Sequence, residues 1–176
     1  MTEDRIPHSP IEDAGLWPGA SLDNVARLRV VAAGLKGAAL EERYIDEPFG
    51  AVWDFIADLE RSVPTFDRTV ASIRILEQDD DQLLIRSSST WRLGFVPMRF
   101  DVTLEDGWCW MVSRPHLYVV GMAAVPEGSG TRYAQLEGPT VPWKPLNPLL
   151  RTFARLHTRH VRSDIEGIVR TVSSER

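Results

Sequence analysis

The stretch YIDEPFGAVWDFIADLERSVPTF, residues 44–66, decides the fold of this chain. A predicted strand ends at Asp46, and a helix then begins at Pro48, because proline at the first helical position needs no backbone N–H donor. Apolar residues recur behind this proline at helical spacing. They are Phe49, Val52, Trp53, Ile56 and Leu59. We therefore expect a short helical pair over residues 48–66, broken near Pro64.

Strand-like segments occupy most of the rest of the chain. The pattern is clearest in residues 96–104, where Met98, Phe100 and Val102 alternate with charged or polar residues. The other predicted strands cover residues 40–46, 70–77, 83–91, 108–113, 118–125 and 131–137. Short turns join consecutive strands, which predicts an antiparallel sheet. A long amphipathic helix over residues 146–172 is expected to lie across the concave face of this strongly bent sheet, since helix and strands each need one face buried.

Composition and charge narrow the classes of protein that the chain can belong to. Its 176 residues are one domain's worth, and 43% of them are hydrophobic, which is enough for a core. The formal net charge of -5 argues against a nucleic-acid partner, since phosphate binding needs an excess of lysine and arginine. Cys109 is the only cysteine, so no intrachain disulfide can form. No apolar run reaches the roughly 20 residues that span a bilayer, and residues 1–15 lack an apolar signal core. We therefore expect a soluble cytoplasmic protein without integral membrane association.

Residues 1–37 are expected to form an N-terminal extension. Its first part, residues 1–20, contains several prolines and glycines and predicts an irregular tail. A helix is predicted over residues 22–33, with Ser21 or Asp23 as its cap. We expect this helix to pack on the outside of the domain or against a partner.

The helical pair also carries a family pattern. Residues 45–58 read I-x-x-P-x-x-x-V-W-x-x-I-A-D, and Gly130, Thr131 and Arg132 open the last predicted strand. Over about residues 38–172 the chain resembles the helix-grip superfamily, also called SRPBCC, START-like or polyketide cyclase/dehydrase-like. The resemblance implies an α+β fold in which a bent antiparallel sheet wraps around a long C-terminal helix, with two short helices after the first strand.

The same resemblance implies a ligand cavity between sheet and helix, and so a ligand-binding domain over residues 38–176. Members include the birch pollen allergen, steroidogenic lipid-transfer domains and bacterial aromatase/cyclases. The superfamily therefore spans enzymes and pure binders, and the fold cannot choose between them. The matching residues serve packing and turns, so no catalytic residue transfers with the pattern.

The C-terminal helix carries the first candidate site. Leu150, Phe153 and His157 step along one apolar stripe, so His157 should face the cavity one turn after Phe153. Its imidazole can donate a hydrogen bond to a ligand carbonyl or act as acid or base near neutral pH. The alternative is a structural histidine satisfied by its neighbours. A metal site from His157, His160 and Asp164 is the weaker hypothesis, because one helix would supply every ligand, and we expect no metal and no cofactor.

Strand residues supply the second group of candidates. Large rings that face inward can shape a flat apolar pocket, and small polar residues leave room and offer hydrogen bonds. The alternative for the rings is ordinary core packing. Together with the helix, the residues expected to bind a ligand are Ile85, Ser87, Phe100, Trp108, Trp110, Tyr133, Leu150, Phe153 and His157.

Three functions stay open on the sequence. The favoured one is binding or transport of a small hydrophobic molecule, such as a lipid, an isoprenoid or a polyketide-like ring system. The second is a polyketide cyclase or dehydratase, in which His157 and a tyrosine would move protons in the same cavity. The third is a protein-interaction module that uses the N-terminal helix. Homodimer formation is compatible with each of them.

Overall fold

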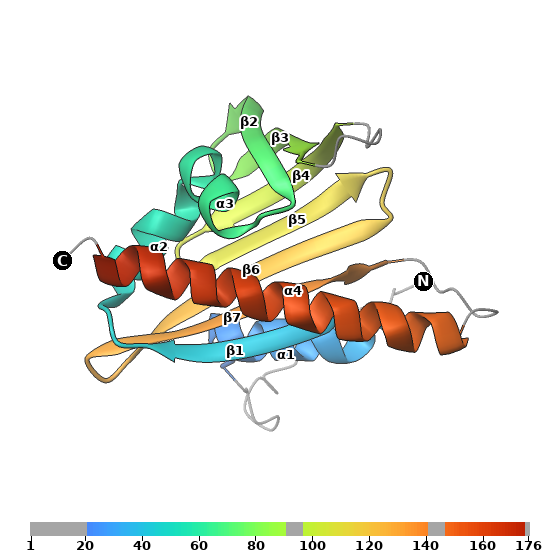
Figure 1. Ribbon diagram of the computed structural model, residues 1–176. Coiled ribbons are helices and arrows are strands. Elements are labelled where there is room, and N and C mark those ends of the chain that lie inside the picture. The colour runs from blue at the N-terminus through green and yellow to red at the C-terminus, as the bar shows by residue number, and fades with distance from the viewer. Residues whose placement is uncertain (1–20, 91–96, 141–146, 175–176) are drawn as a thin grey trace, which may run out of the picture.

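Seven strands form one antiparallel sheet that curves around a long C-terminal helix (Figure 1). The computed structural model describes residues 21–90, 97–140 and 147–174, with the side chains of the last segment described from His157 onward. The strand order across the sheet is β1-β7-β6-β5-β4-β3-β2. The elements are α1 (Asn24–Gly34), β1 (Ala39–Ile45), α2 (Phe49–Ala57), α3 (Leu59–Phe66), β2 (Val70–Asp79), β3 (Gln82–Ser89), β4 (Met98–Glu105), β5 (Trp108–Arg114), β6 (Tyr118–Glu127), β7 (Gly130–Pro139) and α4 (Asn147–Ser174). The predicted α+β helix-grip architecture is confirmed.

Helices α2 and α3 form the expected pair, but the break between them lies earlier than predicted. Pro48 is the N-cap of α2, and its carbonyl accepts a hydrogen bond from Val52 N at 3.2 Å. The chain then turns at Asp58, whose carboxylate accepts a hydrogen bond from Arg61 N at 3.3 Å and so caps α3. Pro64 therefore lies inside α3 rather than between two helices. Pro64 cannot donate the backbone hydrogen bond that this position would otherwise make, and α3 ends two residues later at Phe66.

The main core lies between the inner face of the sheet and helices α2, α3 and α4. Val52 and Ile56 of α2 are fully buried, as are Val161 and Ile168 of α4. The inner face of the sheet contributes Ile85, Val102, Cys109, Met122 and Tyr133 to the same cluster. Cys109 is fully buried in this core, where it packs as a small hydrophobe and where burial raises the pKa of its thiol.

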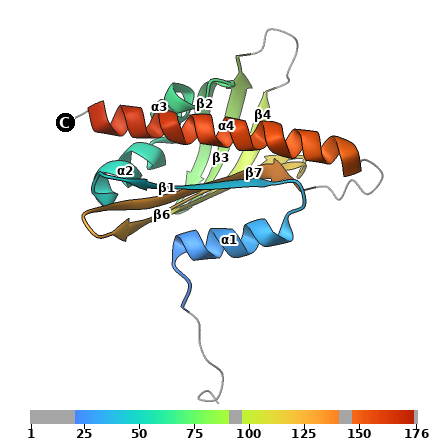
Figure 2. The same ribbon diagram turned by 60° about the horizontal axis from the view of Figure 1, so that its bottom comes forward.

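Helix α1 covers the outer face of the sheet, opposite α4 (Figure 2). It begins after Asp23, whose side chain accepts a hydrogen bond from Ala26 N at 2.7 Å. Val25 and Leu28 are fully buried against β5, β6 and β7. Gly121 of β6 permits this close approach, since a Cβ there would lie 2.7 Å from Leu28 Cδ1. The apolar side of α1 thus has a partner within the chain.

Two further expectations concern the ends of the chain and the membrane. The irregular tail over residues 1–20 lies outside the described residues. None of the helices described in the structure combines the length and apolar character that a membrane crossing requires.

Candidate functional site

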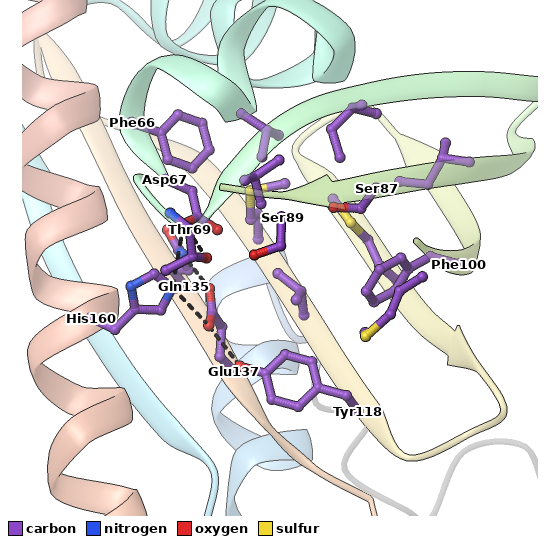
Figure 3. A pocket seen from close by; sticks show the side chains of 18 residues that line it. Phe66, Asp67, Thr69, Ser87, Ser89, Phe100, Tyr118, Gln135, Glu137 and His160 are labelled. Carbon is purple, nitrogen blue, oxygen red and sulfur yellow. Dashed lines mark hydrogen bonds and ion pairs between the residues drawn. The ribbon is translucent and has the colours of Figure 1, made fainter. Parts of the chain in front are cut away.

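A cavity of about 520 Å³ opens between α3, α4 and the inner face of the sheet (Figure 3). Most of its wall is apolar. The apolar lining residues are Val63, Phe66, Val70, Ile73, Ile85, Met98, Phe100, Met111, Val120 and Met122. The polar lining residues are Asp67, Thr69, Ser87, Ser89, Tyr118, Gln135, Glu137 and His160. A molecule in this cavity would therefore contact hydrocarbon on most sides.

Polar groups gather at one end of the cavity, beside α4. We call this group the polar end and define it as Asp67, Tyr118, Gln135, Glu137, His160 and Asp164. Strand β7 presents Gln135 and Glu137 to the inner face because they are two residues apart, so their side chains point the same way. His160 and Asp164 lie one turn apart on α4, and Asp67 follows the end of α3. Elements distant in sequence thus bring these side chains together, and Figure 3 shows Asp67, Gln135, Glu137 and His160 among them.

A chain of hydrogen bonds joins the polar groups of the neighbouring strands β6 and β7 to α4. Tyr133 Oη donates to Gln135 Oε1 at 3.0 Å. Gln135 Nε2 then donates to Glu137 Oε1 at 3.0 Å and to Asp164 Oδ2 at 3.3 Å. Tyr118 Oη donates to Glu137 Oε2 at 2.8 Å. These bonds hold the buried carboxyl groups in fixed positions, as buried polar groups require.

His160 lies among three carboxyl groups. Its Nε2 is 3.4 Å from Asp164 Oδ2, 3.6 Å from Glu137 Oε2 and 3.6 Å from Asp67 Oδ1. Asp67 is itself held in place, because its Oδ1 accepts hydrogen bonds from Thr69 N at 2.8 Å and from Thr69 Oγ1 at 2.7 Å. The imidazole is thus placed to share a proton with any of the three acids.

Burial raises the pKa of two of these acids, Asp164 and Glu137. Asp164 is 1% exposed, and burial together with the charges of Asp67 and Glu137 raises its pKa to about 9. Burial also raises the pKa of Glu137, an effect that the nearby His160 partly opposes. Asp164 is therefore protonated at neutral pH. The polar end therefore combines the protonated carboxyl group of Asp164 with other carboxyl groups that accept hydrogen bonds.

His157 was expected to face the cavity, but it is not among the described residues that line it. His160 lines the cavity instead. The His157 ring meets the Tyr118 ring edge-on, with the ring centroids 5.8 Å apart, and lies beside the backbone of Gly37. Burial lowers the pKa of its imidazole. The apolar stripe does continue through Val161, but the cavity lies to one side of it, where His160 projects.

The strand candidates divide between the two faces of the sheet. Ile85, Ser87 and Phe100 line the cavity. Trp108 and Trp110 lie on the outer face instead, stacked with ring centroids 6.1 Å apart in the region covered by α1. Their expected position in the cavity is thereby corrected. Both faces of β5 are buried, so alternation of polar and apolar residues could not indicate which one faces the cavity.

The remaining candidates do not form part of the described cavity wall. Tyr133 is fully buried behind Gln135, to which its hydroxyl donates. Leu150 and Phe153 belong to the part of α4 whose side chains lie outside the description. Contact of any of these residues with a ligand stays a prediction.

Three residues of the polar end were not singled out from the sequence: Asp67, Gln135 and Glu137. One signal was available for two of them. Gln135 and Glu137 share the inward parity of the fully buried Tyr133, so polar groups occupy positions where a core-facing strand would carry apolar ones. Asp67 carried no such signal, because it lies in a turn.

A metal-binding arrangement exists among the same side chains. Asp67, His160 and Asp164 each offer one ligand atom, and these atoms lie within 4.8 Å of one another. The set differs from the one considered on the sequence, since Asp67 replaces His157. Two of its carboxyl groups already accept hydrogen bonds from Thr69 and Gln135. The expected absence of a metal stays a prediction.

Comparison with known proteins finds the fold but no close relative. No family model matches the sequence, and no curated protein does. Among solved structures, TTHA0849 from Thermus thermophilus matches with a TM-score of 0.61 at 20% identity, over 78% of this chain and 98% of that one. The Zhui aromatase/cyclase from Streptomyces sp. R1128 matches with a TM-score of 0.58 at 10% identity, over 77% and 93%. Ara h 8.0201 matches with a TM-score of 0.59 at 11% identity, over 78% and 97%. The chain therefore has the helix-grip fold of SRPBCC-type proteins.

Proposed function

We propose that the protein binds a small, mainly apolar molecule in the cavity between α4 and the sheet. The observation that carries this proposal is the cavity itself, with about 520 Å³ of space, a mostly apolar wall and one polar end. Sites for small molecules commonly measure about 300–1,000 Å³ and combine apolar walls with a few polar groups that orient the ligand. A lipid, an isoprenoid or a polyketide-like ring system fits this description.

A titration with the neutral fluorescent dye Nile red tests this proposal. Ser87 lies on the cavity wall, so Ser87→Phe would fill part of the space with a ring. Ser88 is its matched control, because its hydroxyl lies 2.6 Å from that of Ser72 on the opposite face of the sheet. We expect saturable dye fluorescence with the wild type and with Ser88→Phe, and at least about a tenfold weaker affinity with Ser87→Phe. Equal affinities for the two variants would show that the dye binds elsewhere.

A second candidate is catalysis of ring closure or dehydration in the same cavity. The polar end favours it, since a protonated acid, a histidine and ionisable carboxyl groups lie together. Ring closure of a poly-carbonyl chain needs a base that removes a proton from a carbon beside one carbonyl. It also needs an acid that protonates the oxygen of the carbonyl under attack. Glu137 would supply the base, and His160, with Asp164 behind it, would supply the acid.

Incubation with a synthetic poly-β-ketone thioester, followed by mass spectrometry, distinguishes this candidate from simple binding. Loss of water from the thioester, abolished in Glu137→Gln but retained in Ser88→Phe, would establish the enzyme. Binding of the thioester without any change of mass would leave the protein as a binder.

A further inference from the structure

The cavity wall carries acids but no lysine or arginine among the side chains that the structure describes. Asp67 and Glu137 line it, and they are only 8% and 4% exposed. His160 is the single described lining residue that can carry a positive charge. Burial already works against negative charge here, since it raises the pKa of Glu137 and keeps Asp164 protonated.

Hydrogen-bond acceptors exceed donors at this end of the cavity. The proton of Tyr118 Oη and the amide protons of Gln135 are already donated to carboxyl oxygens. The hydroxyl of Thr69 is donated to Asp67. An ionised carboxylate has about four acceptor positions on its two oxygens, and the described bonds to Glu137 number two. Capacity to accept from a ligand thus remains, whereas the donors left among the described residues of the polar end are the His160 imidazole and the proton that Asp164 keeps.

From this balance we infer the chemistry of the ligand's polar group: it is a hydrogen-bond donor without negative charge, namely a hydroxyl or a protonated amine. The inference rests on the proposed binding function and narrows it. A ligand carboxylate would lie against the buried carboxyl groups of Asp67 and Glu137, where burial disfavours a further negative charge. Amphiphiles with a carboxylate head, such as fatty acids, are therefore poor ligands. Alcohols, phenols and amines of the same size are good ones.

A series of decyl compounds tests the inference at neutral pH, each below the concentration at which it forms micelles. 1-Decanol, decylamine, decyl methyl ether and decanoic acid share one apolar chain and differ in the head group. Each is used to displace Nile red from the full-length protein. We expect the alcohol, the amine or both to displace the dye at about tenfold or more lower concentration than the acid. The ether, which lacks a donor, should be weaker than the alcohol.

Comparison of the alcohol with the amine identifies which donor the site prefers. Decanoic acid equal to or better than both would overturn the inference, and an ether equal to the alcohol would overturn its donor part. Failure of every compound to displace the dye, or failure of the dye to bind, would contradict the proposed function instead. The two failures are thus distinguishable.

Variants connect the preference to the acids of the polar end. Glu137→Gln keeps an oxygen that can accept from Tyr118 but removes the charge. This variant should reduce the difference between the concentrations at which decanoic acid and decylamine displace Nile red several-fold. Asp67→Asn should act in the same direction. Glu105→Gln is the control, because Glu105 is an exposed carboxylate that pairs with Arg27 at 3.7 Å, away from the cavity. If both cavity variants are folded, as their melting curves would show, and the difference between the acid and the amine is unchanged, then these carboxyl groups do not cause the ligand preference.

Discussion

Replacement of Asp164 by asparagine tests the protonation that burial imposes on the polar end. Burial raises the pKa of this carboxyl from 3.8 to about 9. Between these two values the folded chain keeps a proton that the unfolded chain releases, so the free energy of unfolding falls as the pH rises. Each pH unit in this window corresponds to about 1.36 kcal/mol from this one group. Three units, from about pH 5 to about pH 8, therefore correspond to about 4 kcal/mol.

Asparagine has no proton to lose, and its carbonyl can still accept the hydrogen bond that Gln135 Nε2 donates at 3.3 Å. Urea unfolding at about pH 5 and about pH 8 gives the free energy of unfolding for each protein. Between these two conditions the wild type should lose about 4 kcal/mol more than Asp164→Asn, as an upper value. Glu105→Gln should follow the wild type, because Glu105 is exposed. The same pH dependence in Asp164→Asn and wild type would show that Asp164 does not hold its proton in the folded state.

Four further substitutions test the packing and the choice of histidine. Leu28→Ala on α1 should lower the free energy of unfolding by about 2–5 kcal/mol in a urea titration, since its side chain is fully buried. Gly121→Ala should lower it by about 1–3 kcal/mol, because the new Cβ would lie 2.7 Å from Leu28 Cδ1, and Leu28→Ala should partly relieve the effect in the double variant. His160→Leu should change the affinity for Nile red or decanol by about tenfold, the usual value of one polar contact, because His160 lines the cavity. His157→Leu should alter the melting temperature and leave the affinity within about twofold. The reverse pattern for the two histidines would restore His157 as the ligand-binding residue.

The sequence was sufficient for the architecture because local patterns and global packing agree. Helical spacing behind Pro48 predicts α2, and alternation in residues 98–104 predicts β4; both serve one core. The position of the break between α2 and α3 was wrong because the cap at Asp58 governs it, not the proline that follows. The residue at which a helix begins or ends depends on such single capping contacts.

The site was less predictable because it depends on orientation across the sheet. Trp108 and Cys109 are neighbours on β5, and both are buried, one under α1 and the other in the main core. When a helix covers each face of the sheet, both faces of a strand are apolar. The sequence of the strand then does not indicate which side chains face the cavity. The acid cluster is a product of the fold, since Asp67, Glu137 and Asp164 come together only after α3, β7 and α4 are in place.

Methionine NMR measures occupancy of the cavity most directly. The chain has four methionines, and three of them, Met98, Met111 and Met122, line the cavity, while Met1 lies outside the described residues. With ¹³C-labelled methyl groups and 2-naphthol as a small aromatic alcohol, the ring should shift the three cavity methyl resonances with a single saturation curve. Ser87→Phe should weaken this response, and Ser88→Phe should retain it. Cavity methyl resonances that stay fixed up to the solubility limit of 2-naphthol would contradict the proposal that this cavity holds a small apolar ligand.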